Sequence, residues 1–170
     1  MEARRRWPIR RHKHRLAMET YRGEVAATFT SCIVGKRELF VSENTVAIFR
    51  QALRCASDYH QCQVLIYCFM PDHLHLALRG TTASSDLWKT MTLFKQTTGY
   101  WLAHHLPGVK WQKDFFDHVL RGEDEVLKHL RYVAENPVRR GLAKEWHAYP
   151  FTGSDTLDLR AVFWEGPDPA

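Results

Sequence analysis

The chain has 170 residues, 45% hydrophobic residues and a formal net charge of +5. This length predicts one domain, and the hydrophobic content is enough for a packed core. No apolar run reaches the length of a membrane span, and the charged start lacks the apolar stretch of a signal peptide. We therefore expect a cytoplasmic protein without membrane association. The four cysteines form no Cys-x-x-Cys pair, so we expect them to be reduced.

Positive charge is concentrated at the start of the chain. Residues 1–15 hold seven basic residues against Glu2 alone, which gives them a charge of +6 and leaves −1 for the rest. The candidates for nucleic-acid contact among them are Arg4, Arg5, Arg6, Arg10 and Arg11. Such a basic arm is typical of proteins that bind nucleic-acid phosphates. A solvated tail explains the same composition.

Strand and helix patterns alternate along the first half of the chain. Residues 25–34 are rich in β-branched residues, which predicts a first strand. Ser42 can cap a helix over residues 43–59. A nearly continuous apolar run over residues 63–70 predicts a central strand, and Pro71-Asp72 then turns the chain into a hairpin.

The second half continues the same alternation. Apolar residues at helical spacing over 86–104 predict a second helix, and residues 108–117 are predicted to form another strand. A third helix begins after Gly122. The pattern predicts an α+β domain in which helices pack on an antiparallel sheet. Four tryptophans are expected to anchor the core or an interface: Trp88, Trp101, Trp111 and Trp146.

A pair of histidines stands out in the second strand of the predicted hairpin. The two-residue period of a strand puts His73 and His75 on one face and the leucines at 74, 76 and 78 on the other. Two neutral imidazoles suit a divalent cation with open coordination positions. Two solvated histidines in an amphipathic strand would give the same pattern.

The third predicted helix carries a second group of candidates. Its apolar stripe consists of Val126, Leu127, Leu130, Val133 and Ala134. Tyr132 falls nearly opposite this stripe, and Asn136 lies one turn further on. One helix could thus provide a nucleophile and an oxygen ligand. A solvated tyrosine is the alternative, and Asn136-Pro137 also suits the N-cap and first residue of a new short helix.

Several motifs occur together in the order found in one known family. They are Pro71-Asp72-His73-Leu74-His75, Trp111-Gln112, Asp117-His118-Val119-Leu120-Arg121, Tyr132-Val133, Asn136-Pro137-Val138-Arg139 and Tyr149-Pro150-Phe151. Over residues 21–154 the chain resembles the single-tyrosine transposases of the HUH (His-hydrophobic-His) class, most closely the REP-associated tyrosine transposases, where REP denotes a repetitive extragenic palindrome. Phe151 departs from the pattern, since relatives often carry tryptophan there. We accordingly expect a flexible arm over residues 1–20, this domain over 21–154, and a tail over 155–170.

The resemblance implies a ferredoxin-like fold with the histidine strand central and the tyrosine helix across the active face, usually as a homodimer. It assigns Tyr132 as the nucleophile, and His73, His75 and Asn136 as ligands of Mg²⁺ or Mn²⁺. The implied activity is cleavage and strand transfer of single-stranded hairpin or palindromic DNA through a 5′-phosphotyrosine, in DNA transposition or repeat processing at the nucleoid.

Other basic residues are candidate DNA contacts. Lys95 resembles a helix lysine near the active site of relatives, and His118, Arg121, Arg139 and Arg140 could bind phosphate. Each could equally be a solvated surface residue.

Two other function classes remain open. A non-catalytic DNA- or RNA-binding protein could keep the same fold and the basic arm. A metal-binding interaction protein could use the histidine pair structurally, with a cysteine such as Cys68 as a further ligand.

Overall fold

The computed structural model describes residues 17–163, so the five arginines expected in the basic arm lie outside the described residues. In chain order the strands and helices are β1 (Ala26–Cys32), α1 (Glu43–Tyr59), β2 (Cys62–Met70), β3 (His73–Gly80), α2 (Leu87–His105), β4 (Phe116–Leu120), α3 (Glu123–Ala134), α4 (Asn136–Arg139), β5 (Thr152–Gly153) and α5 (Leu159–Val162). Short 3-10 turns occur at Met18–Tyr21, Val34–Lys36 and Trp146–Ala148.

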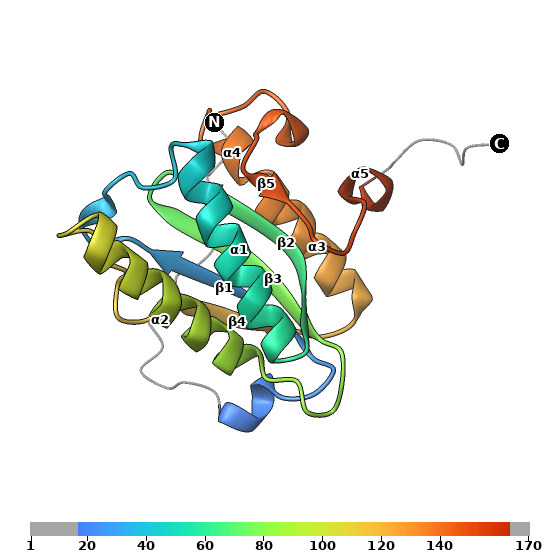
Figure 1. Cartoon of the computed structure of the whole chain (residues 1–170). Helices are drawn as coiled ribbons and strands as arrows, with labels where there is room; N and C mark the ends of the chain where they lie inside the picture. The colour runs from blue at the N-terminus through green and yellow to red at the C-terminus, as the bar shows by residue number, and fades with distance from the viewer. Residues whose placement is uncertain (1–16, 164–170) are drawn as a thin grey trace.

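The strands form one antiparallel sheet in the order β4-β1-β3-β2-β5 (Figure 1). Helix α1 connects β1 to β2, and α2 connects β3 to β4. This βαββαβ path with β1 and β3 in the middle is the ferredoxin-like arrangement. The α+β class, the ferredoxin-like sheet and the central position of the histidine strand are therefore confirmed.

The two faces of the sheet are covered by different helices. Figure 1 shows α1 and α2 side by side over one face, with α3 on the other. The leucines of β3 (Leu74, Leu76 and Leu78) are fully buried in the cluster that α1 and α2 cover. Ala77, which points the other way, belongs to a second cluster formed with Val126, Leu130 and Val133 of α3. Because both faces of β3 are covered, successive side chains of this strand point alternately toward the two sides of the sheet.

The helix boundaries follow from local capping. The Ser42 hydroxyl accepts a hydrogen bond from the backbone N–H of Thr45 at 3.3 Å, as predicted for the start of α1. The Asp86 carboxylate accepts from the N–H of Lys89 at 2.9 Å and caps α2. Helix α3 begins without a side-chain cap, after Gly122, whose φ of 81° is easily reached only by glycine.

The strand predicted over residues 108–117 is wrong, because β4 occupies Phe116–Leu120 instead. The preceding segment makes only an isolated bridge, between Ile33 and Trp111. Trp111 packs against the first cluster and donates its indole N–H to the Thr98 hydroxyl at 2.9 Å. The segment before β4 is thus irregular, although its aromatic residues have the spacing of a strand and pack against the core. This spacing is the reason for the wrong prediction.

Two further expectations need correction. Leu127 was predicted on the apolar stripe of α3 but is 46% exposed, since it lies at the margin of the buried face. Asn136 is the first residue of α4 and not its N-cap. Glu135 takes that position with nearly helical angles, and α3 continues almost directly into α4.

The packing also bears on the other expectations. Trp88, Trp101 and Trp111 pack against the first cluster and Trp146 against the second, which confirms them as core anchors. Leu159, from the segment expected to be a tail, is buried in the second cluster. Within residues 17–163 no helix combines the length and apolar character required to cross a membrane.

The first cluster should dominate stability. Phe49 of α1 is 0% exposed and contacts the rings of Phe40, Phe94 and Trp101. We predict that Phe49→Ala lowers the free energy of unfolding by about 3–5 kcal/mol, measured by urea denaturation. The matched control is Arg54→Ala on the exposed face of the same helix, which should change it by no more than about 0.5 kcal/mol. Equal effects of the two substitutions would contradict this packing.

Candidate active site

The two histidines of β3 face each other at close range. Their Nε2 atoms lie 3.0 Å apart, and the rings are nearly perpendicular, at 86°. On the far side of each ring, His73 Nδ1 lies 2.6 Å from the Asp72 carboxylate and His75 Nδ1 lies 3.0 Å from the Thr30 hydroxyl. A proton on each Nδ1 satisfies both partners and leaves both Nε2 lone pairs directed into the same small space.

The surroundings favour neutral imidazoles. Burial lowers the pKa of His75 to about 3, with the positive charges of His73, Arg139 and Arg140 acting in the same direction. Burial also lowers the pKa of His73, although the hydrogen bond that its Nδ1 donates to Asp72 opposes this shift. Neutral imidazole is the form that binds metal ions, and the tautomer with its proton on Nδ1 leaves Nε2 as the metal ligand.

A second group lies at the end of α3. Tyr132 is 45% exposed, whereas Asn136 is 8% exposed. The Asn136 amide donates to the backbone oxygens of Tyr132 and Val133, both at 3.3 Å. These bonds hold the amide of Asn136 against the last turn of the helix that carries the phenol.

Arg139 connects this group to the histidines. Its guanidinium donates to Asn136 Oδ1 at 2.9 Å and to the Tyr132 carbonyl at 2.7 Å, and it lies 4.0 Å above the Tyr132 ring. The same charge contributes to the lowered pKa of His75. An amide oxygen has two lone pairs, so Asn136 Oδ1 can accept this bond and still bind a cation.

Helix α3 is joined to β3 by a side-chain contact at its start, and two arginines just beyond its end act on the pKa values of the histidines. Arg79, near the end of β3, donates to Glu123 at the start of α3 at 2.8 Å. At the other end, the charges of Arg139 and Arg140 reach the histidine pair. Along one face, β3 and α3 therefore run in opposite directions, and the last turn of α3 with Tyr132 lies toward the His73 end of the strand.

The remaining candidates occupy different places. Lys95 donates to the backbone oxygens of Gln112, Lys113 and Asp114, at 2.7, 3.3 and 3.3 Å, and so holds the segment before β4. The backbone N–H of Arg121 donates to the Glu125 carboxylate at 2.5 Å. The expected roles of Lys95 and Arg121 in DNA binding remain predictions.

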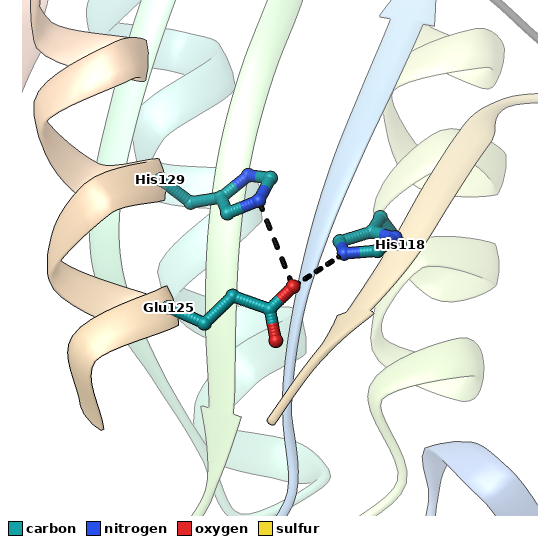
Figure 2. Close-up of side chains that lie close together, drawn as sticks. All are labelled: His118, Glu125 and His129. Atoms are coloured by element: carbon teal, nitrogen blue, oxygen red, sulfur yellow. Dashed lines mark hydrogen bonds and ion pairs between the residues drawn. The ribbon is translucent and has the colours of Figure 1, made fainter. Parts of the chain in front are cut away.

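His118 takes part in a cluster that the sequence did not predict. Its Nε2 lies 2.8 Å from Glu125 Oε1, and His129 Nε2 lies 4.0 Å from the same oxygen (Figure 2). The four-residue spacing of Glu125 and His129 places them on one turn of α3 and could have indicated the pair. His118 could be added only once the position of β4 was known.

The contacts that orient the imidazoles were also missed. Asp72 is adjacent to His73 in sequence, which was an available signal. Thr30 is opposite His75 only because of the β1–β3 register, which no local pattern reveals.

Cys68, considered as a further metal ligand, is fully buried, and its sulfur accepts a hydrogen bond from the Thr152 hydroxyl at 3.2 Å. Burial raises the pKa of this thiol to about 11. The thiolate that a metal requires is therefore disfavoured, which argues against a structural site built on Cys68.

Comparison with known proteins identifies relatives of the whole arrangement. Residues 24–136, which include both histidines, Tyr132 and Asn136, match the family described as "Transposase IS200 like". A Haemophilus influenzae protein with the provisional name REP-associated tyrosine transposase is 24% identical over 140 residues, covering 71% of this chain and 77% of that protein. The REP-associated tyrosine transposase of Escherichia coli K12 is 27% identical over 95 residues, covering 53% of each chain.

A solved structure extends the likeness to the fold. A REP-associated tyrosine transposase bound to a REP hairpin superimposes with a TM-score of 0.73 at 19% identity, covering 94% of each chain. At this identity the comparison establishes that the two chains share a fold. It agrees with the strand order and helix placement described above.

The environment of His75 leads to a test in metal-free protein. Since burial lowers its pKa to about 3, the ring should stay neutral as the pH falls from 8 to 5. We predict that the His75 imidazole resonances, assigned with His75→Gln, show no protonation step in this range by NMR. A titration midpoint near the ordinary histidine value of about 6.5 would contradict the packing around this ring.

Proposed function

Because the chain belongs to the IS200-like transposase family, we propose that it cleaves and rejoins single-stranded DNA through a covalent bond to Tyr132. Its relatives are named tyrosine transposases, and the chain is a DNA-processing enzyme of this family. One observation carries the proposal: the His73 and His75 Nε2 atoms lie 3.0 Å apart, and a hydrogen bond at the Nδ1 atom of each ring fixes its orientation.

The histidine pair fits a divalent cation. Ligands at about 2.1 Å from an ion and at right angles to each other lie about 3.0 Å apart, as in octahedral coordination. The two Nε2 atoms have this separation. Asn136 Oδ1 is the proposed third ligand, and two imidazoles with one amide oxygen suit Mn²⁺ or Mg²⁺ better than a closed structural zinc site.

Each residue then has a definite task. The phenol oxygen of Tyr132 attacks phosphorus as its proton leaves, the bond from phosphorus to the 3′ oxygen breaks, and that oxygen takes up a proton. The products are a 5′-phosphotyrosine and a free 3′-hydroxyl. A cation at His73, His75 and Asn136 would supply polarisation of a phosphate oxygen. Attack by a 3′-hydroxyl reverses the step, and no nucleotide cofactor is required.

Hairpin-bearing single-stranded DNA is the proposed substrate, because a relative of the same fold was solved with a REP hairpin. Arg139 borders an open groove of about 370 Å³ that is also lined by Lys144, Trp146 and His147. Two carboxylates belong to the same lining: Glu135 lies 3.6 Å from Arg139 and Glu145 lies 2.8 Å from His147. Basic and aromatic side chains of this kind bind phosphates and stack on bases. We assign Arg121, Arg139 and Arg140 to phosphate contacts.

The packing of α3 favours catalysis within one chain. This helix packs on the β2–β3 hairpin that carries the histidines, and the Arg79–Glu123 hydrogen bond joins its start to β3. We therefore assign Tyr132 to the metal site of its own chain, also where two chains form a homodimer.

The proposed nucleophile can be tested by substitution. Labelled single-stranded DNA with a hairpin, incubated with the protein and Mn²⁺, should give an adduct that survives denaturation and gel electrophoresis. Tyr132→Phe should abolish it, because the attacking oxygen is removed. The matched control is Tyr100→Phe, an exposed tyrosine on α2 that should leave the adduct intact.

An undiminished adduct in Tyr132→Phe would assign the nucleophile to another residue. Hairpin binding without an adduct in any variant would instead favour the non-catalytic nucleic-acid-binding alternative.

A further prediction concerns metal dependence. Removal of divalent cations with a chelator should abolish adduct formation, and added Mn²⁺ should restore it. His73→Ala removes one proposed ligand and should raise the Mn²⁺ concentration for half-maximal adduct at least ~10-fold. His104→Ala at the end of α2 serves as the matched control. Full adduct formation in the presence of the chelator would refute the metal requirement.

A further inference from the structure

A second group of metal-ligating side chains lies outside the proposed active site. Among residues 17–163, His118, Glu125 and His129 are the one set of three His, Cys, Asp or Glu side chains whose ligand atoms lie within 4.8 Å of one another. His118 comes from β4, and Glu125 and His129 come from successive turns of α3 (Figure 2). Two separate elements thus direct three donors to one point.

The donors are positioned before any ion binds. His118 Nε2 and His129 Nε2 lie 2.8 and 4.0 Å from the same oxygen of Glu125. The other carboxylate oxygen accepts the backbone N–H of Arg121, which holds the carboxylate in place. Ligands at about 2.1 Å in tetrahedral coordination lie about 3.4 Å apart, between these two distances. A small rotation of the Glu125 side chain would equalise them.

The charge states also suit a metal. The hydrogen bond from His118 is the largest of the effects that lower the pKa of Glu125, which keeps the carboxylate ionised. Burial lowers the pKa of His129, which favours the neutral ring. The side chain of His118 is 49% exposed and that of Glu125 is 32% exposed, so an ion can enter from solvent and keep water as a fourth ligand.

We propose that His118, Glu125 and His129 form a second metal site, which binds a transition-metal ion of the zinc type. Two imidazoles and one carboxylate are a ligand set that zinc uses in proteins, with water in the fourth position. The ion would join β4 to the start of α3. His129 precedes Tyr132 by three residues, so the same ion would hold the helix that carries the proposed nucleophile.

The test separates this site from the histidine pair. Full-length His73→Ala/His75→Ala protein, without an affinity tag and stripped with a chelator, is titrated with Co²⁺ by visible absorption and then with Zn²⁺ in competition. We expect one equivalent of Co²⁺ with the intense absorption of a tetrahedral site, displaced by one equivalent of Zn²⁺. Adding His118→Gln or His129→Gln should weaken Zn²⁺ binding at least ~100-fold, since loss of an outer-shell partner alone costs up to that much.

His104→Gln provides the matched control, because this exposed histidine at the end of α2 bonds to the backbone oxygen of Tyr100 and contacts the Tyr100 ring of its own helix, away from His118, Glu125 and His129. It should leave the affinity unchanged. Should the double variant fail to fold, the Co²⁺ spectrum of the unmodified chain must lose its tetrahedral absorption with His118→Gln, an exposed position. Absence of a tetrahedral Co²⁺ signal, or equal Zn²⁺ affinity with and without His118, would overturn the proposal.

Discussion

The alternation of side chains along β3 is the constraint on which the rest of the structure depends. Leu74, Leu76 and Leu78 are buried beneath α1 and α2, so the intervening residues must face α3. A shift of one residue in the register would exchange the histidines for leucines on both faces. The hydrophobic core of one face therefore determines where the imidazoles of the other face lie.

Removing most of two imidazoles from water has a cost that the surrounding contacts offset. A neutral ring loses less solvation than a charged one, and burial lowers both histidine pKa values accordingly. Asp72 and Thr30 satisfy the outer nitrogens. The two Nε2 atoms lie 3.0 Å apart, so that either one donates a hydrogen bond to the other or both bind one cation. Such an arrangement of two imidazoles is suited to binding a metal ion and is not the packing of a hydrophobic core.

Much of this could be predicted from the sequence, for identifiable reasons. The alternation at His73 and His75 and the cap at Ser42 are local patterns, and both were interpreted correctly. The irregular segment around Trp111 was not, because aromatic anchors at strand-like spacing pack equally well from a loop. The contacts of Thr30 and His118 could not be predicted for another reason. Contacts between strands, or between a strand and a helix, depend on the strand register and on where the helix packs.

Arg139 illustrates the same limit from the functional side. The sequence indicated only a basic residue suited to phosphate, whereas the folded chain places its guanidinium over Tyr132 and against Asn136. The guanidinium of Arg139 thus contacts both the proposed nucleophile and the proposed oxygen ligand. Its geometry arises because α3 runs almost directly into α4, which could not be foreseen from a proline at the boundary.

The most direct test of the account measures the proximity of the phenol to the metal. Protein that is labelled with fluorotyrosine and carries His118→Gln, so that the second proposed site is disabled, is titrated with Mn²⁺ and observed by fluorine NMR. The Tyr132 line is assigned by comparison with Tyr132→Phe. We expect one equivalent of the paramagnetic ion to broaden the Tyr132 line beyond detection, whereas the line should stay sharp when His73→Ala and His75→Ala are added. A Tyr132 line that stays sharp while the histidine pair is intact, or that broadens equally with and without the pair, would contradict the proposed site.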